Sequence, residues 1–364
     1  MAFHTHDTER EVAATPLRSN VSTQPIDPVR TSFEVVVTLA QGTPRETTLK
    51  ASIAGWVFVP QVIAEEGAAS LWYLGIPGAT YRGLSYFDRQ VEGYPADAFS
   101  IARFLARQGI GLVVIDTLGT GESEIEANGE LITRFVTAEA NAQVLSQVRE
   151  RLLAGMLVPE LDAVPENALF LGGFGHSMGA FQLTQLALLL EERGAPLDAA
   201  IFAGWGHSMP DYSRVGIDAK GLIAVLTEQN GYSVIPRPLM RLVFYGPQPS
   251  VPAKLIEVDE RDATIFPKGL MDEGLIPGIV AQEAGQVQCP VLNVLASYDF
   301  FPSAQQQGVF YRSTRLFTAF TQAHAAHCNF EDSRHEYWRA IVGWTRLVAA
   351  LRYPFHLLPC EERP

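Results

Sequence analysis

The sequence predicts an α/β fold, in which a mostly parallel sheet is flanked by helices and interrupted by a largely helical insertion. From residue 71 onward, short apolar strands alternate with amphipathic helical segments, as in a parallel sheet covered on both faces. Residues 168–190 have the pattern of a buried strand, a tight glycine-rich turn and an apolar helix. Residues 207–288 break this alternation over a length too great for an ordinary connection, which predicts an insertion.

The composition is that of a globular protein and excludes several classes of partner. Of the 364 residues, 47% are hydrophobic and 18% are charged, which suits a well-buried core. The formal net charge of −13 argues against binding to nucleic acid or to an anionic membrane surface. No stretch reaches the roughly 20 apolar residues of a membrane-spanning helix, and the first residues lack the apolar segment of a secretion signal. Cys289, Cys328 and Cys360 lack metal-type spacing and are typical of reduced thiols, so we expect a cytoplasmic protein.

The first part of the chain is expected to form an arm and then the start of the sheet. Residues 32–39 and 48–59 are rich in β-formers and flank a polar segment, which predicts a hairpin. Residues 71–76 are expected to form a buried strand that ends at Pro77. We therefore expect four regions: an N-terminal arm (1–30), a first part of the core (31–206), an insertion (207–288) and a second part of the core (289–364).

The rest of the core is expected to alternate between helices and strands. We expect helices at 96–108, 137–156, 180–190 and 336–351, and strands at 111–116, 168–175, 199–204, 290–296 and 315–320. The insertion is expected to cap the edge where the strands end, because ligands gather at the carboxyl ends of parallel strands.

The strongest motif is Gly175-His176-Ser177-Met178-Gly179, which fits the pattern G-x-S-x-G. Such a serine occupies a sharp turn between a strand and a helix, where only residues without bulk fit at the flanking glycines. The turn lifts the hydroxyl above the sheet and directs the N-terminus of the helix at any oxyanion formed there. The motif therefore predicts that Ser177 is a nucleophile.

A second segment, Gly206-His207-Ser208-Met209, repeats four of these residues. Pro210 takes the place of the last glycine, and proline has a fixed backbone angle and no amide hydrogen. No long apolar helix follows Ser208 either. We therefore predict that Ser177, and not Ser208, is the nucleophile.

A nucleophilic serine needs a histidine to take its proton and a carboxylate to orient that histidine. Asp299, just beyond the strand at 290–296, is the predicted acid, with Asp211 as the alternative. His327, before the last helix, is the predicted base, with His324 three residues away as the alternative or as a packed histidine. No carboxylate or cysteine pattern completes a metal site near these histidines, so we expect no metal and no cofactor.

An oxyanion site requires two amide donors. Met178 follows the nucleophile and is the first expected donor. Ile76 is the second, because the next residue, Pro77, has no N–H. The alternative interpretation is that the glycines around Ile76 only form a tight turn.

Substrate contacts are expected from the glycine loop, from the motif and from the insertion. The residues in question are Gly75, His176, Tyr232, Phe244 and Tyr245. The apolar and aromatic residues of the insertion suggest a lipophilic substrate. They equally fit the core of the insertion itself, and a structural role for His176 is an equal alternative.

Together these residues resemble the α/β-hydrolase superfamily over about residues 32–352. Residues 116–123 match the D-x-x-G-x-G-x-S loop of that superfamily, whereas Leu74 stands where many members have the histidine of His-Gly-x-Pro. The resemblance implies an α/β-hydrolase sheet, the chain order serine, acid, histidine, and a cap domain.

A serine at this turn implies an acyl-enzyme and therefore a carbonyl substrate, since related dehalogenases and epoxide hydrolases use an aspartate there. The expected activity is that of a serine esterase or lactonase acting on a lipophilic small-molecule substrate, for which a bulky acyl group or a macrolactone is one expectation. Cleavage of a C–C bond or acyl transfer by the same triad is one alternative, and a non-catalytic ligand-binding protein is another. The arm and the apolar residues of the insertion, if exposed, favour a homodimer.

Overall fold

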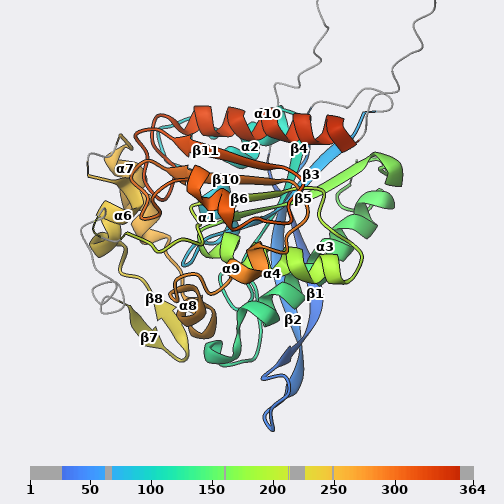
Figure 1. Ribbon diagram of the computed structural model, residues 1–364, viewed down its shortest axis with the longest axis horizontal. Helices are drawn as coiled ribbons and strands as arrows, with labels where there is room; N and C mark the ends of the chain where they lie inside the picture. Colours follow the sequence, from blue (N-terminus) through green and yellow to red (C-terminus); the bar gives the residue numbers. More distant parts are fainter. Residues whose placement is uncertain are drawn as a thin grey trace, which may run out of the picture.

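A computed structural model describes residues 27–61, 68–159, 161–211, 213, 226–247 and 250–352. Its centre is an eight-stranded sheet (Figure 1). The strands are β1 (Val29–Leu39), β2 (Thr47–Phe58), β3 (Ser70–Ile76), β4 (Ile110–Ile115), β5 (Leu169–His176), β6 (Ala200–Ala203), β10 (Val291–Ala296) and β11 (Phe317–Gln322). They lie in the order β1-β2-β4-β3-β5-β6-β10-β11.

The sheet is antiparallel only at one end. β1 pairs with β2, and β2 with β4, in antiparallel register, so the predicted hairpin is confirmed. The pairs from β4 to β11 are parallel. β4, β5, β6 and β10 are buried along their whole length, as expected for parallel strands covered on both faces. The outer strand β1 instead alternates buried and exposed residues along its second half.

Helices cover both faces of the sheet (Figure 1). They are α1 (Gly83–Phe87), α2 (Ile101–Arg107), α3 (Arg134–Leu153), α4 (Met178–Glu192) and α10 (Arg334–Arg352). α2 and α10 pack together on one face, and α3 and α4 on the other. α2 starts later than the predicted residue 96, because the side chain of Ser100 caps it by accepting a hydrogen bond from Arg103 N.

The segment between β6 and β10 contains both helices and strands. Its elements are β7 (Thr227–Gln229), β8 (Tyr232–Val234), a 3₁₀ helix (Arg237–Met240), α6 (Arg241–Tyr245), α7 (Ala253–Arg261), β9 (Phe266–Pro267), α8 (Lys268–Gly274) and α9 (Ala281–Ala284). β7, β8 and β9 form a small antiparallel sheet that the expectation of a largely helical insertion missed. Strands of two or three residues are too short to show a periodic pattern in the sequence.

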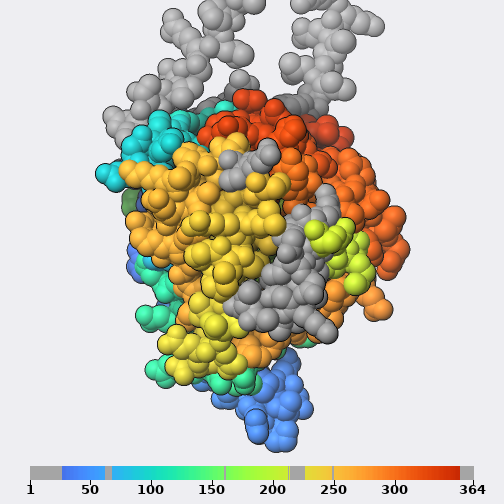
Figure 2. Space-filling model, turned by 90° about the vertical axis from the view of Figure 1, so that its left-hand side faces the viewer, coloured from blue at the N-terminus to red at the C-terminus, as the bar shows by residue number. Residues whose placement is uncertain are grey.

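This segment lies beside the end of the large sheet, with α6, α7 and α8 grouped on one side of the molecule (Figure 1). Figure 2 faces that side, where its residues (yellow to gold) form a broad surface. Whether it is a domain bounded at 207 and 288 stays a prediction, as do the cytoplasmic location and the homodimer. Most of the predicted arm, together with Cys360, lies outside the described residues. None of the described helices is long and apolar enough to cross a membrane.

Candidate active site

Ser177 occupies the sharp turn that the sequence predicts. β5 ends at His176, α4 begins at Met178, and Ser177 between them has φ 51° and ψ −121°. This left-handed conformation is strained for a residue with a side chain and places the serine where a strand meets a helix. A β carbon at Gly175 would lie 2.5 Å from Ala180 Cα, and one at Gly179 would overlap the carbonyl oxygen of Ile76. The close approach of α4 to β3 and β5 therefore requires both glycines.

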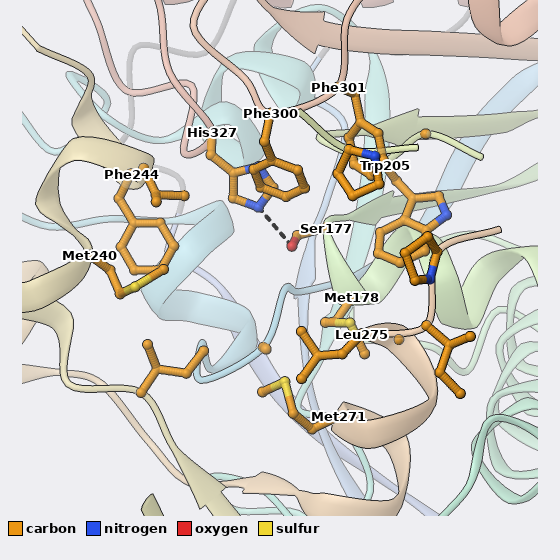
Figure 3. A pocket seen from close by; sticks show the side chains of 18 of the residues that line it. Ser177, Met178, Trp205, Met240, Phe244, Met271, Leu275, Phe300, Phe301 and His327 are labelled. Atoms are coloured by element: carbon orange, nitrogen blue, oxygen red, sulfur yellow. Dashed lines mark hydrogen bonds between the residues drawn. The ribbon is translucent and has the colours of Figure 1, made fainter. Parts of the chain in front are cut away.

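The structure brings Ser177, His327 and Asp299 together. Ser177 Oγ lies 2.8 Å from His327 Nε2 (Figure 3), and His327 Nδ1 lies 3.1 Å from Asp299 Oδ1. Asp299 follows β10 and is fully buried, and His327 lies on the loop between β11 and α10. The carboxylate accepts from Nδ1–H, which leaves Nε2 free to accept the serine proton. This is the geometry of an activated nucleophile.

The alternatives for acid, base and nucleophile have other partners or positions. The carboxylate of Asp211 accepts hydrogen bonds from the amide and hydroxyl of Ser213. His324 is exposed, with a positive φ of 53°. Ser208 Oγ accepts a hydrogen bond from Gln307 Nε2 at 2.9 Å. The hydrogen bonds that join Ser177, His327 and Asp299 do not involve the side chains of the alternatives.

His176, next to Ser177, contacts the backbone of the predicted base, His327. It is fully buried, its ring stacks on Tyr86 at 4.0 Å, and its Nε2 lies 2.8 Å from the backbone oxygen of His327. A carbonyl oxygen only accepts, so Nε2–H of His176 donates. Burial and then the neighbouring His327 lower the pKa of His176 well below its usual value, so that the ring is neutral. His176 thus holds the backbone of His327 without adding charge to the site.

The expected oxyanion donors differ in position. Met178 lines the cavity next to Ser177. Ile76 is fully buried, pairs with Gly175 in the sheet and is not among the residues that line the cavity, and its role as a donor stays a prediction. From the same loop it is Ala79 that lines the cavity.

A cavity of about 850 Å³, including its open mouth, lies over Ser177 (Figure 3). Its walls come from the core and from the segment between β6 and β10, and they are mainly apolar. The main side chains are those of Met178, Trp205, Leu226, Ile235, Met240, Val243, Phe244, Met271, Leu275, Ile276, Phe300 and Phe301. No Asp, Glu, Lys or Arg is among the described lining residues. The hydroxyl of Ser177 therefore faces an environment suited to neutral, apolar groups.

Solved structures of the same architecture include three hydrolases with low sequence identity. A soluble variant of monoglyceride lipase from Saccharomyces cerevisiae has a TM-score of 0.56 at 12% identity and covers 92% of this chain and 99% of its own. A thermophilic esterase from Thermogutta terrifontis (TM-score 0.53, 14% identity) and proline iminopeptidase from Mycobacterium smegmatis (0.54, 12%) each cover 87% of this chain and 99% of their own. The protein has the α/β-hydrolase fold. No family model and no curated protein matches the sequence.

Only part of the expected substrate-binding set reaches the cavity in this fold. Phe244 lines it. Tyr232 is half-buried and packs against the core, with its hydroxyl 3.5 Å from Ala127 O, and Tyr245 donates to the buried Asp259. Gly75 is buried against Val114 and Phe87. Tyr232 and Tyr245 therefore fit the alternative expectation, in which aromatic residues of the insertion pack within it and against the core and do not contact substrate.

The cavity residues that the sequence reasoning missed come mainly from the segment between β6 and β10, and the aromatic ones come from two strand ends. Trp205 follows β6, and Phe300 and Phe301 follow Asp299 directly. Aromatic residues immediately after a predicted catalytic acid were the available signal, because the loops at the carboxyl ends of the strands line the site. Among the residues that the structure describes, no group of three or more His, Cys, Asp or Glu side chains could hold a metal ion.

Proposed function

We propose that this α/β-hydrolase is a serine hydrolase that cleaves a lipophilic carboxylic ester or lactone through an acyl-enzyme on Ser177. The observation that carries the proposal is the chain of contacts from Ser177 Oγ to His327 Nε2 (2.8 Å) and from His327 Nδ1 to Asp299 (3.1 Å), at the base of an apolar cavity. No other described hydroxyl has both a histidine partner and a position in that cavity.

In the proposed reaction, Ser177 Oγ attacks the carbonyl carbon while His327 Nε2 takes its proton. The oxyanion is stabilised by the amide of Met178 and by the amide of Ala79, which replaces Ile76 as our second donor. His327 then gives the proton to the leaving alcohol, and the acyl group remains on Ser177. Water, deprotonated by His327, attacks the acyl-enzyme and releases the acid. In a lactone both products remain on one molecule.

The cavity supports a neutral substrate with an apolar acyl or alcohol group. A charged group would lose its hydration there without an opposite charge among the described lining residues, which is strongly unfavourable. Met240 lies on one side of Ser177, and Met178 and Met271 lie on another (Figure 3). Methionine side chains are flexible and adapt to irregular apolar shapes. We therefore expect the enzyme to prefer substrates with apolar chains and to accept chains of different shapes.

The test pairs turnover of p-nitrophenyl esters of increasing chain length with labelling by a fluorophosphonate mapped by mass spectrometry. We expect ester turnover that rises with chain length beyond acetate, and a label on Ser177 but not on Ser208. A label on Ser177 without ester or lactone turnover would overturn the proposed reaction in favour of acyl transfer or C–C cleavage. Neither label nor turnover would favour the ligand-binding alternative.

A further inference from the structure

The predicted base is held by a helix of the insertion. Helix α6 (Arg241–Tyr245) places two backbone oxygens against the loop that carries His327. His327 N donates to Val243 O at 3.3 Å, and Cys328 N donates to Phe244 O at 3.2 Å. The last four carbonyl groups of a helix have no partner within it, so these oxygens are free to accept. The ring of Phe244 also stacks on that of His327, with centroids 6.2 Å apart and planes 20° from parallel.

Helix α6 is itself fixed by a group of buried charged and hydroxyl side chains, the Asp259 cluster, formed by Asp259, Arg237, Arg89, Tyr81 and Tyr245. Each of these side chains is at most 2% exposed. Asp259 pairs with Arg89 of the core and with Arg237 of the insertion, at 2.9 Å in the second case. Tyr245, the last residue of α6, and Tyr81 of the core both donate their hydroxyls to the same oxygen, Asp259 Oδ2.

The cluster reaches the base from two directions. Tyr245 directly follows Phe244, whose carbonyl oxygen and ring contact the His327 loop. From the core side, the hydroxyl of Tyr81 lies 3.0 Å from Cys328 Sγ, one residue after His327. Burial and then the charge of Asp259 raise the pKa of Tyr245, so that its hydroxyl stays protonated and remains a donor.

From these contacts we infer that Asp259, Tyr245 and α6 are positioning elements for His327. The insertion is therefore required for the geometry of the catalytic triad and does more than cover the cavity. The inference rests on the proposed function. The Asp259 cluster fixes α6, and α6 holds the backbone amide of His327 while His176 holds its carbonyl oxygen. A displacement of α6 would move Nε2 away from Ser177 Oγ even though none of these groups touches substrate.

Energetics support a role in geometry over a role in stability alone. Burying an ion pair is costly, and well-packed apolar residues often serve stability equally well. A directional network instead fixes the position of the parts that it joins. Reaction rates depend steeply on such positions, since an error of about 1 Å can lower a rate by about 100-fold.

The first experiment compares Tyr245→Phe with Tyr73→Phe. Both changes remove one hydroxyl from a fully buried tyrosine with a single strong partner, and Tyr73 contacts Thr345 on α10, away from the site. We expect Tyr245→Phe to lower kcat by about tenfold, with a smaller change in KM because Val243 and Phe244 of α6 also line the cavity. Tyr73→Phe should lower the melting temperature similarly and leave kcat as it is. Equal kcat in the two variants would overturn the inference.

A second experiment does not depend on turnover. In the wild-type protein, the Nδ1–H proton of His327, bonded to Asp299, should give a downfield proton NMR signal. We expect Tyr245→Phe and Asp259→Asn to shift or broaden this signal, and Tyr73→Phe to leave it in place. An unchanged signal in folded Tyr245→Phe would reject the positioning role. A wild-type protein that shows the signal but hydrolyses nothing would instead reject the proposed function, while the signals of the variants would still show whether α6 positions His327.

Discussion

The same four residues, Gly-His-Ser-Met, occur twice in this protein and form two different structures. Residues 175–178 span the end of β5 and the start of α4, while residues 206–209 come after β6 and lead into the insertion. Both serines line the same cavity. Only Ser177 contacts a histidine, His327, whereas Ser208 is bonded to Gln307.

The difference arises from the residues that come directly after each serine. After Ser177, α4 begins at once, and its first turn lies against β3 because Gly179 has no side chain. After Ser208, Pro210 prevents the same turn. There, Gln307 Oε1 accepts from the amides of His207 and Ser208, which fixes the segment as a wall of the cavity. A short motif thus acquires its chemistry from the elements on either side of it.

The largest expected effect separates the two serines. Ser177→Ala should lower kcat for an ester substrate by roughly 10⁴-fold or more, because no nucleophile remains. Ser208→Ala removes only the hydrogen bond to Gln307 and should change kcat by less than about threefold. Both are measured as initial rates on purified protein with matched melting temperatures. A large loss in Ser208→Ala would mean that the second segment takes part in the reaction.

The two histidines offer a smaller test. His176→Phe keeps a ring against Tyr86 but removes the donor to His327 O, so we expect kcat to fall about tenfold with little change in KM. His207 instead donates to or accepts from the hydroxyl of Tyr311, away from the triad. His207→Phe should lower stability and preserve kcat. Equal kcat losses in both variants would contradict a specific role for His176.

The sequence predicted the core and the triad better than it predicted the walls of the site. Strand and helix periods are local, so nearly every core element lies within a few residues of its expected place. Ser177, Asp299 and His327 carry signals of residue type, order and position after a strand. Ile76 was predicted to be the second oxyanion donor because Pro77 has no N–H. The residue of the same loop that lines the cavity is Ala79.

The roles of the insertion residues depend on contacts between distant segments, which have no local pattern. Tyr245 and Phe244 are adjacent aromatic residues, yet one binds Asp259 and the other lines the cavity. Arg89 and Asp259 lie 170 residues apart in the chain and meet only in the fold. No period or spacing in the sequence predicts such a buried pair.

The smallest expected effect is a dependence of stability on pH, to which the histidines of both Gly-His-Ser-Met segments contribute. Burial lowers the pKa of His207 to about 3, and burial and His327 lower that of His176, so both rings are neutral in the folded protein. Unfolded histidines gain a proton below about pH 6.5. Unfolding therefore takes up protons below that pH, and the stability present above it is lost as the pH falls toward the folded-state pKa values.

This dependence can be assigned to a single histidine by comparing His207→Phe with Tyr311→Phe. Both remove the hydrogen bond between these residues, but only Tyr311→Phe keeps the titrating ring. The free energy of unfolding, measured with urea between about pH 4 and pH 7, should fall less steeply with acid in His207→Phe, by about 1.4 kcal/mol per pH unit at most. Tyr311→Phe should keep the wild-type slope. Equal slopes in all three proteins would mean that His207 takes up no proton on unfolding. In that case burial would not be what keeps the ring of His207 neutral in the folded protein.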